Sequence, residues 1–122
     1  MRAVFDTNIV IDYLKGLREA AQEIERFDQR FISIITYIEV LVGIEDTETI
    51  DSVKSFLSTF DIVMVGQKIA DMAIVTRQKY RLKIPDAIIL ATANSLSALL
   101  VTRNSKDFSQ NISSIRIPYK LK

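Results

Sequence analysis

Short apolar runs alternate along this chain with longer segments in which apolar residues recur every three or four positions. A short run that is apolar throughout predicts a buried strand, because a strand covered on both faces has no polar side. Such runs lie at Arg2–Phe5, Phe31–Ile34, Asp61–Val65 and Leu99–Val101. A weaker run at Ile115–Ile117, just before Pro118, predicts a last strand at a sheet edge.

The segments between these runs have helical spacing. In Leu17–Phe27 the apolar residues fall at intervals of 3, 1, 3 and 3, which places them on one helix face. The predicted helices are Ile9–Leu14, Leu17–Phe27, Thr36–Ile44, Thr47–Phe60, Ile69–Leu82 and Ala87–Leu96. We expect a break at Ile84-Pro85-Asp86, because the residue before a proline avoids the helical region.

Strands that alternate with helices and are apolar throughout are typical of a parallel sheet with helices on both faces. The predicted fold class is therefore α/β. The chain has 122 residues, no internal repeat and no linker, which predicts one domain spanning residues 1–122. The apolar stripes of Leu17–Phe27 and Thr47–Phe60 either pack into the core or offer a surface to a partner helix.

The composition excludes several kinds of chemistry. The chain has no Cys, which excludes disulfides, thiolate metal sites and a Cys nucleophile. It has no His, which excludes a Ser-His-Asp triad and imidazole metal ligands. Any hydrolytic chemistry must therefore use carboxylates, with a hard cation bound by oxygen. The N-terminal residues do not resemble a signal peptide and no apolar run is long enough for a membrane span, so we expect a cytoplasmic protein without membrane contact.

Charge is unevenly distributed along the chain, although its net value is only +1. Residues 1–67 hold 6 Lys/Arg and 12 Asp/Glu, whereas residues 68–122 hold 10 Lys/Arg and 3 Asp/Glu. Four basic residues fall within seven positions, at Arg77, Lys79, Arg81 and Lys83. This cluster is either a solvated helix face or a rim that contacts phosphates.

Four acidic residues stand out by their position. Asp6 ends the first strand, Asp107 lies shortly after Val101, Asp86 opens the apolar helix, and Glu39 lies one turn into a helix that follows a strand. In parallel sheets, ligands bind beyond the carboxyl ends of the strands. Taken singly, Asp6 and Asp86 could be helix N-caps, Glu39 a surface residue and Asp107 an ordinary loop acid.

Together the four acids favour a cation site. Each lies next to apolar sequence, where an unpaired charge is costly. Two carboxylates about 4 Å apart repel by roughly 4 kcal/mol at an effective dielectric of 20. A divalent cation would remove that repulsion, and Mg²⁺ or Mn²⁺ prefers carboxylate and water ligands.

Four segments of the chain carry a family resemblance. They are Val4–Asn8, Ile32–Gly43, Ile84–Ala93 and Leu100–Phe108, and they cover essentially the whole chain in the family's order. On these segments the chain resembles the PIN-domain family, and more narrowly the VapC-type toxins of bacterial and archaeal toxin–antitoxin pairs. The resemblance implies a three-layer α/β/α sandwich with a short parallel central sheet.

The resemblance also implies a metal-dependent endoribonuclease that uses Mg²⁺ or Mn²⁺. Asp6, Glu39 and Asp86 then match the acidic metal positions, which would also be catalytic. Family members place a fourth acid where this chain has either Asn104 or Asp107, and we expect Asp107 to fill it with Asn104 as a polar helper. Further family positions orient the carboxylates or contact substrate. They correspond to Thr7, Asn8 and Thr102, and Arg103 and Lys106 flank the site in sequence.

The partners implied by the resemblance are an RNA substrate, a cognate antitoxin and a second copy of the chain in a homodimer. Two other enzyme classes fit less well. A haloacid-dehalogenase-like phosphatase needs a second Asp where this chain has Asn8, and a receiver domain needs a Lys near the end of a late strand, where Val101 is followed by Thr-Arg-Asn. A non-catalytic PIN-like RNA-binding or interaction module, or a stand-alone RNA-processing nuclease, remains an alternative that RNA cleavage with and without EDTA would test.

Overall fold

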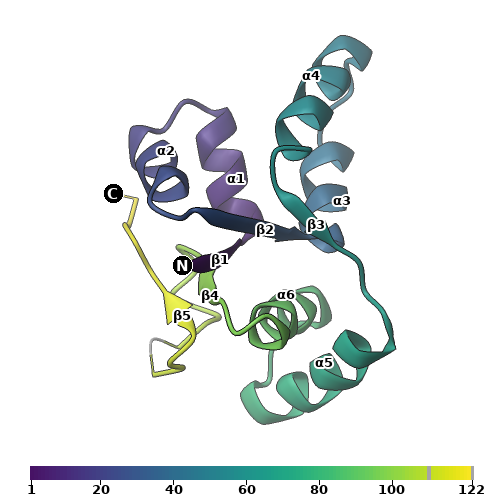
Figure 1. Cartoon of the computed structure of the whole chain (residues 1–122), viewed down its shortest axis with the longest axis vertical. Helices are drawn as coiled ribbons and strands as arrows, with labels where there is room; N and C mark the ends of the chain where they lie inside the picture. The colour runs from purple at the N-terminus through teal and green to yellow at the C-terminus, as the bar shows by residue number, and fades with distance from the viewer. Residues whose placement is uncertain (110, 122) are drawn as a thin grey trace.

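The computed structural model describes residues 1–109 and 111–121, and its centre is a parallel sheet (Figure 1). The strands are β1 (Arg2–Phe5), β2 (Gln29–Ser33), β3 (Asp61–Val63), β4 (Leu99–Val101) and β5 (Ile115–Arg116). They lie in the order β3-β2-β1-β4-β5, and every neighbouring pair is parallel. The first strand is therefore central, and the run at Ile115 forms an edge strand as predicted.

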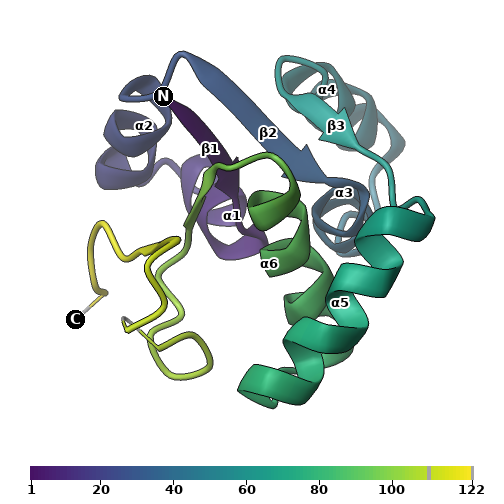
Figure 2. The same cartoon turned by 60° about the horizontal axis from the view of Figure 1, so that its bottom comes forward.

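Six helices within the described residues cover the sheet. They are α1 (Thr7–Leu14), α2 (Arg18–Glu25), α3 (Ile34–Val42), α4 (Thr47–Leu57), α5 (Gln67–Tyr80) and α6 (Ile84–Ser95). Figures 1 and 2 show α1 and α2 on one face of the sheet and α5 and α6 on the other. This arrangement confirms the predicted three-layer α/β/α sandwich.

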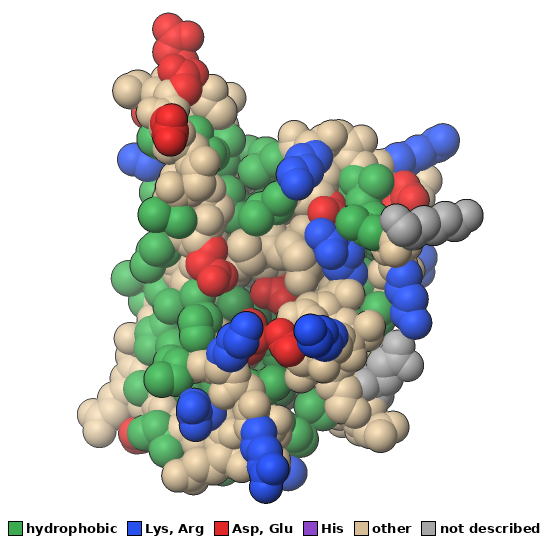
Figure 3. All heavy atoms as spheres, turned by 180° about the vertical axis from the view of Figure 1, so that it is seen from behind, with side chains coloured by type: hydrophobic (Ala, Val, Ile, Leu, Met, Phe, Trp, Pro, Cys, Tyr) green, Lys and Arg blue, Asp and Glu red, His purple; other side chains and the backbone are tan. Residues whose placement is uncertain are grey.

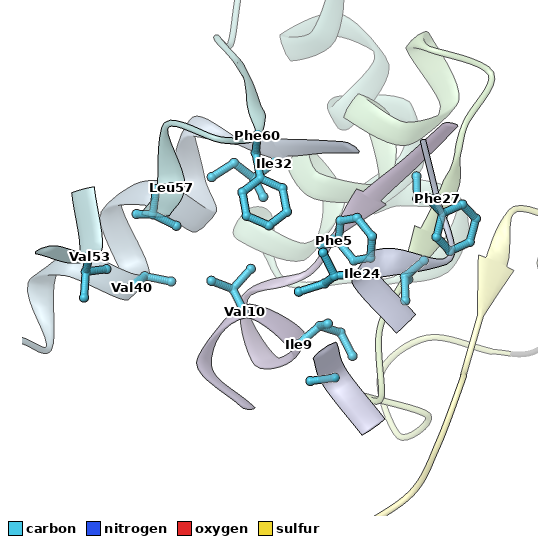
Figure 4. Packing of buried hydrophobic residues seen from close by; sticks show 13 residues of the cluster. Phe5, Ile9, Val10, Ile24, Phe27, Ile32, Val40, Val53, Leu57 and Phe60 are labelled. Atoms are coloured by element: carbon cyan, nitrogen blue, oxygen red, sulfur yellow. The ribbon is translucent and has the colours of Figure 1, made fainter. Parts of the chain in front are cut away.

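The alternation of side chains along β1 divides the core into two parts. Phe5 points to the face covered by α1 and α2, where its ring packs edge-on against Phe27 and Phe60 at centroid distances of 5.9 and 5.8 Å (Figure 4). Val4 points to the opposite face and packs with Leu90 and Leu100 in the second core. The sheet is therefore buried on both sides, as its apolar strands predicted.

The apolar stripes of α2 and α4 belong to the first core. Ala20 and Ile24 of α2 and Val53 and Leu57 of α4 are buried there. Phe27 and Phe60, which belong to the same stripes, lie just beyond the ends of the two helices, which both end earlier than predicted (Figure 4). The alternative that these stripes pack into the core is therefore confirmed.

Helix α6 is mostly buried in the second core, but it begins earlier than predicted. The expected break at Ile84-Pro85-Asp86 is wrong: Lys83 is the extended N-cap residue and Pro85 lies within the first turn. A proline is tolerated there because the first turn of a helix needs no backbone N–H partner. The first hydrogen bond runs from the Ala87 N–H to the Lys83 carbonyl at 2.9 Å.

In the part of the chain that the structure describes, no helix has both the length and the apolar character needed to cross a membrane.

Helix α3 also begins earlier than predicted, at Ile34 rather than Thr36. The Ser33 hydroxyl at the end of β2 accepts a hydrogen bond from the Ile35 N–H at 3.1 Å and so caps the helix. Strand β2 therefore passes into α3 without a loop. This direct junction fixes the first turn of α3, and Glu39 beyond it, relative to the sheet.

Candidate active site

The site lies at the carboxyl edge of the sheet, where three neighbouring strands end. Asp6 follows β1, Glu39 lies on the helix that follows β2, and the segment Thr102–Phe108 follows β4. Asp86 joins them from the first turn of α6. On the face seen in Figure 3, Asp and Glu side chains gather near the centre with Lys and Arg side chains on either side. The topology therefore brings acids from four separate parts of the sequence to one region.

Asp6 is buried, with only 4% of its surface exposed. Its Oδ1 accepts a hydrogen bond from the Thr7 N–H at 2.8 Å and caps α1. Its Oδ2 accepts from the Thr102 hydroxyl at 2.7 Å and from the Asn8 amide at 3.3 Å. The capping role is thus confirmed, but it occupies only one of the two carboxylate oxygens.

Thr102 and Asn8 form a rigid frame around Asp6. The Thr102 hydroxyl donates to Asp6 and accepts from Asn8 Nδ2 and from the Asn104 N–H, both at 3.1 Å. One donor and two acceptor positions are all that a hydroxyl has, so this group is fully used. Asn8 Oδ1 in turn accepts from the Arg103 N–H at 3.2 Å. These contacts fix the orientation of the Asp6 carboxylate.

Glu39 is exposed, yet its carboxylate is held in place. The Thr7 hydroxyl donates a 2.6 Å hydrogen bond to Glu39 Oε1. Thr36 Oγ1 lies 3.1 Å from Thr7 Oγ1 and is itself buried. Thr7 therefore connects α1 to α3 through the Glu39 carboxylate. Thr36, which the sequence analysis did not single out, lies beside the Thr7 hydroxyl and supports its position.

Asp86 and Asp107 complete the set from opposite sides. Asp86 is half-buried and is not an N-cap, because Lys83 occupies that position. Asp107 is exposed and hydrogen-bonds Asn104 twice: Asn104 Nδ2 donates to Asp107 Oδ2 at 2.9 Å, and the Asp107 N–H donates to Asn104 Oδ1 at 3.1 Å. Asn104 and Asp107 are therefore neighbours that orient each other.

The electrostatics connect the four acids. Burial raises the pKa of Asp6 to about 6, the hydrogen bonds from Thr102 and Thr7 oppose the rise, and the charges of Asp86 and Glu39 add to it. The pKa of Asp86 is also raised, first by burial and then by the charges of Asp107 and Glu39. The neighbouring negative charges thus make it harder for Asp6 and Asp86 to ionise, which is the electrostatic condition that a bound cation relieves.

The donor set fits a hard divalent cation, although the acids are spread out. Among residues 1–109 and 111–121, no three acidic side chains form a group that could hold a metal ion as they stand. Mg²⁺ commonly keeps several waters and binds through only one or two carboxylates. A buried aspartate with neighbouring carboxylates and no nitrogen or sulfur ligand therefore suits Mg²⁺ or Mn²⁺ through partly water-mediated contacts.

Comparison with known proteins decides the family. A PIN domain family model matches residues 3–111. The chain belongs to the PIN-domain family. No match was found among curated proteins.

Several solved structures resemble this PIN domain. A chain in a toxin–antitoxin complex from Klebsiella pneumoniae is 46% identical with a TM-score of 0.92, covering 98% of this chain and 99% of that one. A chain of VapBC-1 from nontypeable Haemophilus influenzae is 26% identical with a TM-score of 0.73, covering 95% and 96%. A chain of VapBC2 from Rickettsia felis, bound to a promoter DNA fragment, is 23% identical with a TM-score of 0.79, covering 94% and 96%. The predicted resemblance is thereby confirmed.

Three features of this PIN domain go beyond the sequence prediction. The Arg103 guanidinium, which flanks the site in sequence, binds Asp12 through two hydrogen bonds. Asp12 and Tyr119 are site-adjacent residues that the sequence analysis missed. Asp12 could have been noticed as a charge inside the otherwise apolar stretch from Ile9 to Leu14, whereas nothing in the sequence marks Tyr119. Lys106 is exposed beside Asp107.

Proposed function

We propose that this PIN domain is a metal-dependent endoribonuclease and the toxin of a toxin–antitoxin pair, acting in the cytoplasm. The observation that carries the proposal is the buried Asp6 carboxylate at the end of the central strand, whose pKa is raised by burial and by Asp86 and Glu39. Capping of α1 uses only one oxygen of this acid, and clusters in which neighbouring acids destabilise a buried carboxylate mark functional sites. The PIN-domain membership, and the 46% identity to a chain of a toxin–antitoxin complex, support the same assignment.

The residues of the site would have two roles, metal binding and orientation of the metal ligands. Asp6, Glu39, Asp86 and Asp107 would hold Mg²⁺ or Mn²⁺. Such a cation, when bound, activates water and neutralises charge on a phosphodiester. Thr102 and Asn8 keep the Asp6 carboxylate in one orientation, and Thr7 does the same for Glu39. Preorganised groups of this kind spare the reaction the cost of ordering them.

The basic cluster Arg77, Lys79, Arg81 and Lys83 supports RNA as the substrate. All four side chains are exposed at the junction of α5 and α6. Lys83 lies three residues before Asp86. Burial and nearby acids raise the pKa of Asp86, and the positive charge of Lys83 opposes this rise, so the two side chains lie close enough to interact. A phosphate chain that follows these residues therefore leads into the acidic site. Single-stranded RNA suits such an open rim because its backbone can bend to the protein surface.

A groove beside the site supports an antitoxin as partner. A hollow of about 540 Å³ lies between α1 and the α3–α4 pair, and Ile11, Leu14, Val40 and Ile44 line it together with Glu39. An apolar segment bound there would lie directly against the acidic site. A protein that covers the groove would therefore exclude RNA from Glu39 while it buries its own apolar side chains.

The proposal includes a homodimer. Exposed apolar residues lie on α3, after β3 and on α5, at Ile38, Val42, Met64 and Val75, and the exposed fraction of Val42 reaches 79%. Figure 3 shows hydrophobic side chains along this edge of the molecule. Strand β3 is an edge strand, so no further strand of the sheet lies beyond it on this side. A second copy of the chain would bury these residues.

The decisive experiment is cleavage of a labelled single-stranded RNA by the purified protein. We expect cleavage that needs Mg²⁺ or Mn²⁺ and stops with EDTA. Asp86→Asn should abolish it while the protein stays folded, with an unfolding temperature equal to or above that of the wild type, because one of several repelling charges is removed. Asp51→Asn, which changes an exposed acid on α4, should cleave normally.

Two outcomes would favour the alternatives. RNA binding without cleavage in any metal would indicate a non-catalytic RNA-binding module. Metal-dependent cleavage without a stable complex with any neighbouring gene product would leave a stand-alone nuclease. Unaltered cleavage by Asp86→Asn would overturn the proposed site.

A further inference from the structure

Two successive turns of α1 hold the same residue of the loop after β4. Asn8 accepts the backbone N–H of Arg103 through Oδ1 at 3.2 Å. Asp12, four residues later on the same helix face, accepts the guanidinium of Arg103, with Oδ2 2.6 Å from Nε and Oδ1 3.0 Å from the terminal nitrogen. Both ends of Arg103 are therefore fixed to one helix.

Asp12 also reaches the C-terminal segment. The Tyr119 hydroxyl donates to Asp12 Oδ2 at 2.9 Å, the same oxygen that Arg103 Nε contacts. Asp12 is only 4% exposed. Burial by itself would raise its pKa, yet the hydrogen bonds from Arg103 and Tyr119 hold the pKa below its usual value. The buried carboxylate is thus charged and paired. Loss of Arg103 would leave a buried charge without its counter-charge, whereas loss of Tyr119 would remove only one of its hydrogen bonds.

The loop between these anchors carries part of the acidic site. Thr102 lies at one end, and Phe108, fully buried in the second core, lies at the other. Asn104 and Asp107 lie between them and hydrogen-bond each other. Arg103 forms a bidentate ion pair with Asp12 on α1. Among the described residues, this is the only ion pair that connects the loop to a helix.

We propose that Asp12 and Tyr119 are positioning residues for RNA cleavage: through Arg103 they hold the loop Thr102–Phe108 so that Asp107 faces Asp86. The inference rests on the proposed function. It also assigns Arg103 a different role from that of a phosphate contact, because Asp12 holds the Nε and one terminal nitrogen of its guanidinium in a bidentate pair. The guanidinium acts here through its planar fork, which a lysine cannot reproduce.

The structure provides a matched control. Glu23 is also a 4% exposed carboxylate, and it is bound by the guanidinium of Arg116 on β5. Glu23→Gln removes the same kind of buried ion pair as Asp12→Asn, but neither side chain of that pair hydrogen-bonds the loop. Arg116 meets the loop only through its backbone carbonyl, which accepts the Thr102 N–H at 3.1 Å and which the substitution leaves in place. Comparison of the two variants separates loss of loop positioning from general loss of stability.

The test measures steady-state RNA cleavage and, without metal or RNA, amide hydrogen exchange of residues 103–108. We expect Asp12→Asn to lower kcat about tenfold or more with KM within about twofold, because a misplaced catalytic group costs rate rather than binding. Tyr119→Phe should give a smaller loss in the same direction. Both should speed exchange in the loop, whereas Glu23→Gln should change neither kcat nor loop exchange.

Substitution of Arg103 distinguishes positioning from phosphate contact. Arg103→Lys should lose kcat as much as Arg103→Gln does, and neither should change the salt dependence of RNA binding. A phosphate contact would instead be kept by Lys, and its loss in Gln would lower the salt slope by about 0.7. That result, or unchanged loop exchange in Asp12→Asn, overturns the inference. If the wild type cleaves no RNA, the proposed function fails, but the exchange comparison still tests whether Asp12 holds the loop.

Discussion

The two oxygens of Asp6 face different demands. Oδ1 closes the first turn of α1, and Oδ2 lies in the frame made by Thr102 and Asn8. An N-cap is stabilised by a negative charge, whereas a buried site flanked by acids disfavours one. The second influence prevails, since burial and the charges of Asp86 and Glu39 leave the pKa raised to about 6.

This pKa predicts how stability depends on pH in metal-free protein. Asp6 rises from 3.8 to about 6 on folding, so between these values the folded state binds more protons than the unfolded state. The free energy of unfolding must therefore fall as pH rises from about 4 to 6, by up to about 1.4 kcal/mol per pH unit. Asp86, whose pKa is raised chiefly by burial, contributes with the same sign.

Urea denaturation in EDTA between pH 4 and 7 measures this slope. The lowered pKa values of Asp12, Asp28 and Asp46 act with the opposite sign, but below about pH 4, where the unfolded acids titrate. Asp6→Asn should lose most of the slope, and Mg²⁺ should stabilise the wild type at pH 7 more than at pH 4. If the free energies of unfolding of wild type and Asp6→Asn differ by the same amount at every pH from 4 to 6, the electrostatic account of Asp6 is contradicted.

At the scale of helices and strands, the sequence predicts what depends on local pattern. The apolar strands, the buried α6 and the position of Asp6 at a strand end follow from runs and spacing within a few residues. The start of α6 was missed because the rule for residues before proline outweighed the tolerance of a first helical turn for proline. The polar start of β2 at Gln29 was missed because no apolar run marks it.

Contacts between distant segments could not be predicted in the same way. Arg103 lies 91 residues from Asp12, and Tyr119 lies 107 residues from it. A charge in an apolar helix indicates that some partner must exist, but many basic residues could fill that place. The same holds for Asn104 and Asp107: the sequence left them as alternatives for one position, and only the turn geometry makes them a hydrogen-bonded pair.

The junction of α5 and α6 carries a prediction of its own. Replacement of Arg77, Lys79, Arg81 and Lys83 by Gln should weaken RNA binding uniformly across sequences. The salt slope should fall by about 0.7 for each phosphate contact that is lost, while metal affinity changes little because these side chains are not ligands. Filter binding at several salt concentrations measures the slope.

A variant with the same loss of charge elsewhere serves as the control for the basic cluster. Exposed basic residues away from this junction are available for it, at Arg18, Lys54, Lys68 and Lys120. Their replacement by Gln should lower the salt slope of RNA binding less than replacement of the basic cluster does. Equal slopes in the two quadruple variants would mean that the junction is an ordinary solvated surface and that RNA approaches the acids from another side.

At the scale of the whole molecule, the exposed apolar edge predicts self-association. Sedimentation at about micromolar concentration should show a dimer, which corresponds to a binding free energy of about 8 kcal/mol. Val42→Lys together with Val75→Lys should give a folded monomer, because each places a charge in the apolar surface without touching the core. Gln22→Lys, on the exposed side of α2, should remain dimeric. A wild type that stays monomeric would remove the dimer from the proposal.

The central position of β1 has a consequence for protein synthesis. The first strand pairs with β2 early in the chain and with β4 near the other end, and the Asp6 carboxylate receives the hydroxyl of a residue 96 positions later. A ribosome that has translated only as far as α6 has made Asp6, Glu39 and Asp86, but β1 still lacks one neighbour and the loop with Asp107 does not exist. On the proposed function, an unfinished chain cannot cleave the RNA around it, including the message that encodes it. On the same proposal, the strand order of the sheet delays toxicity until translation has passed Asp107, without a second protein during that interval.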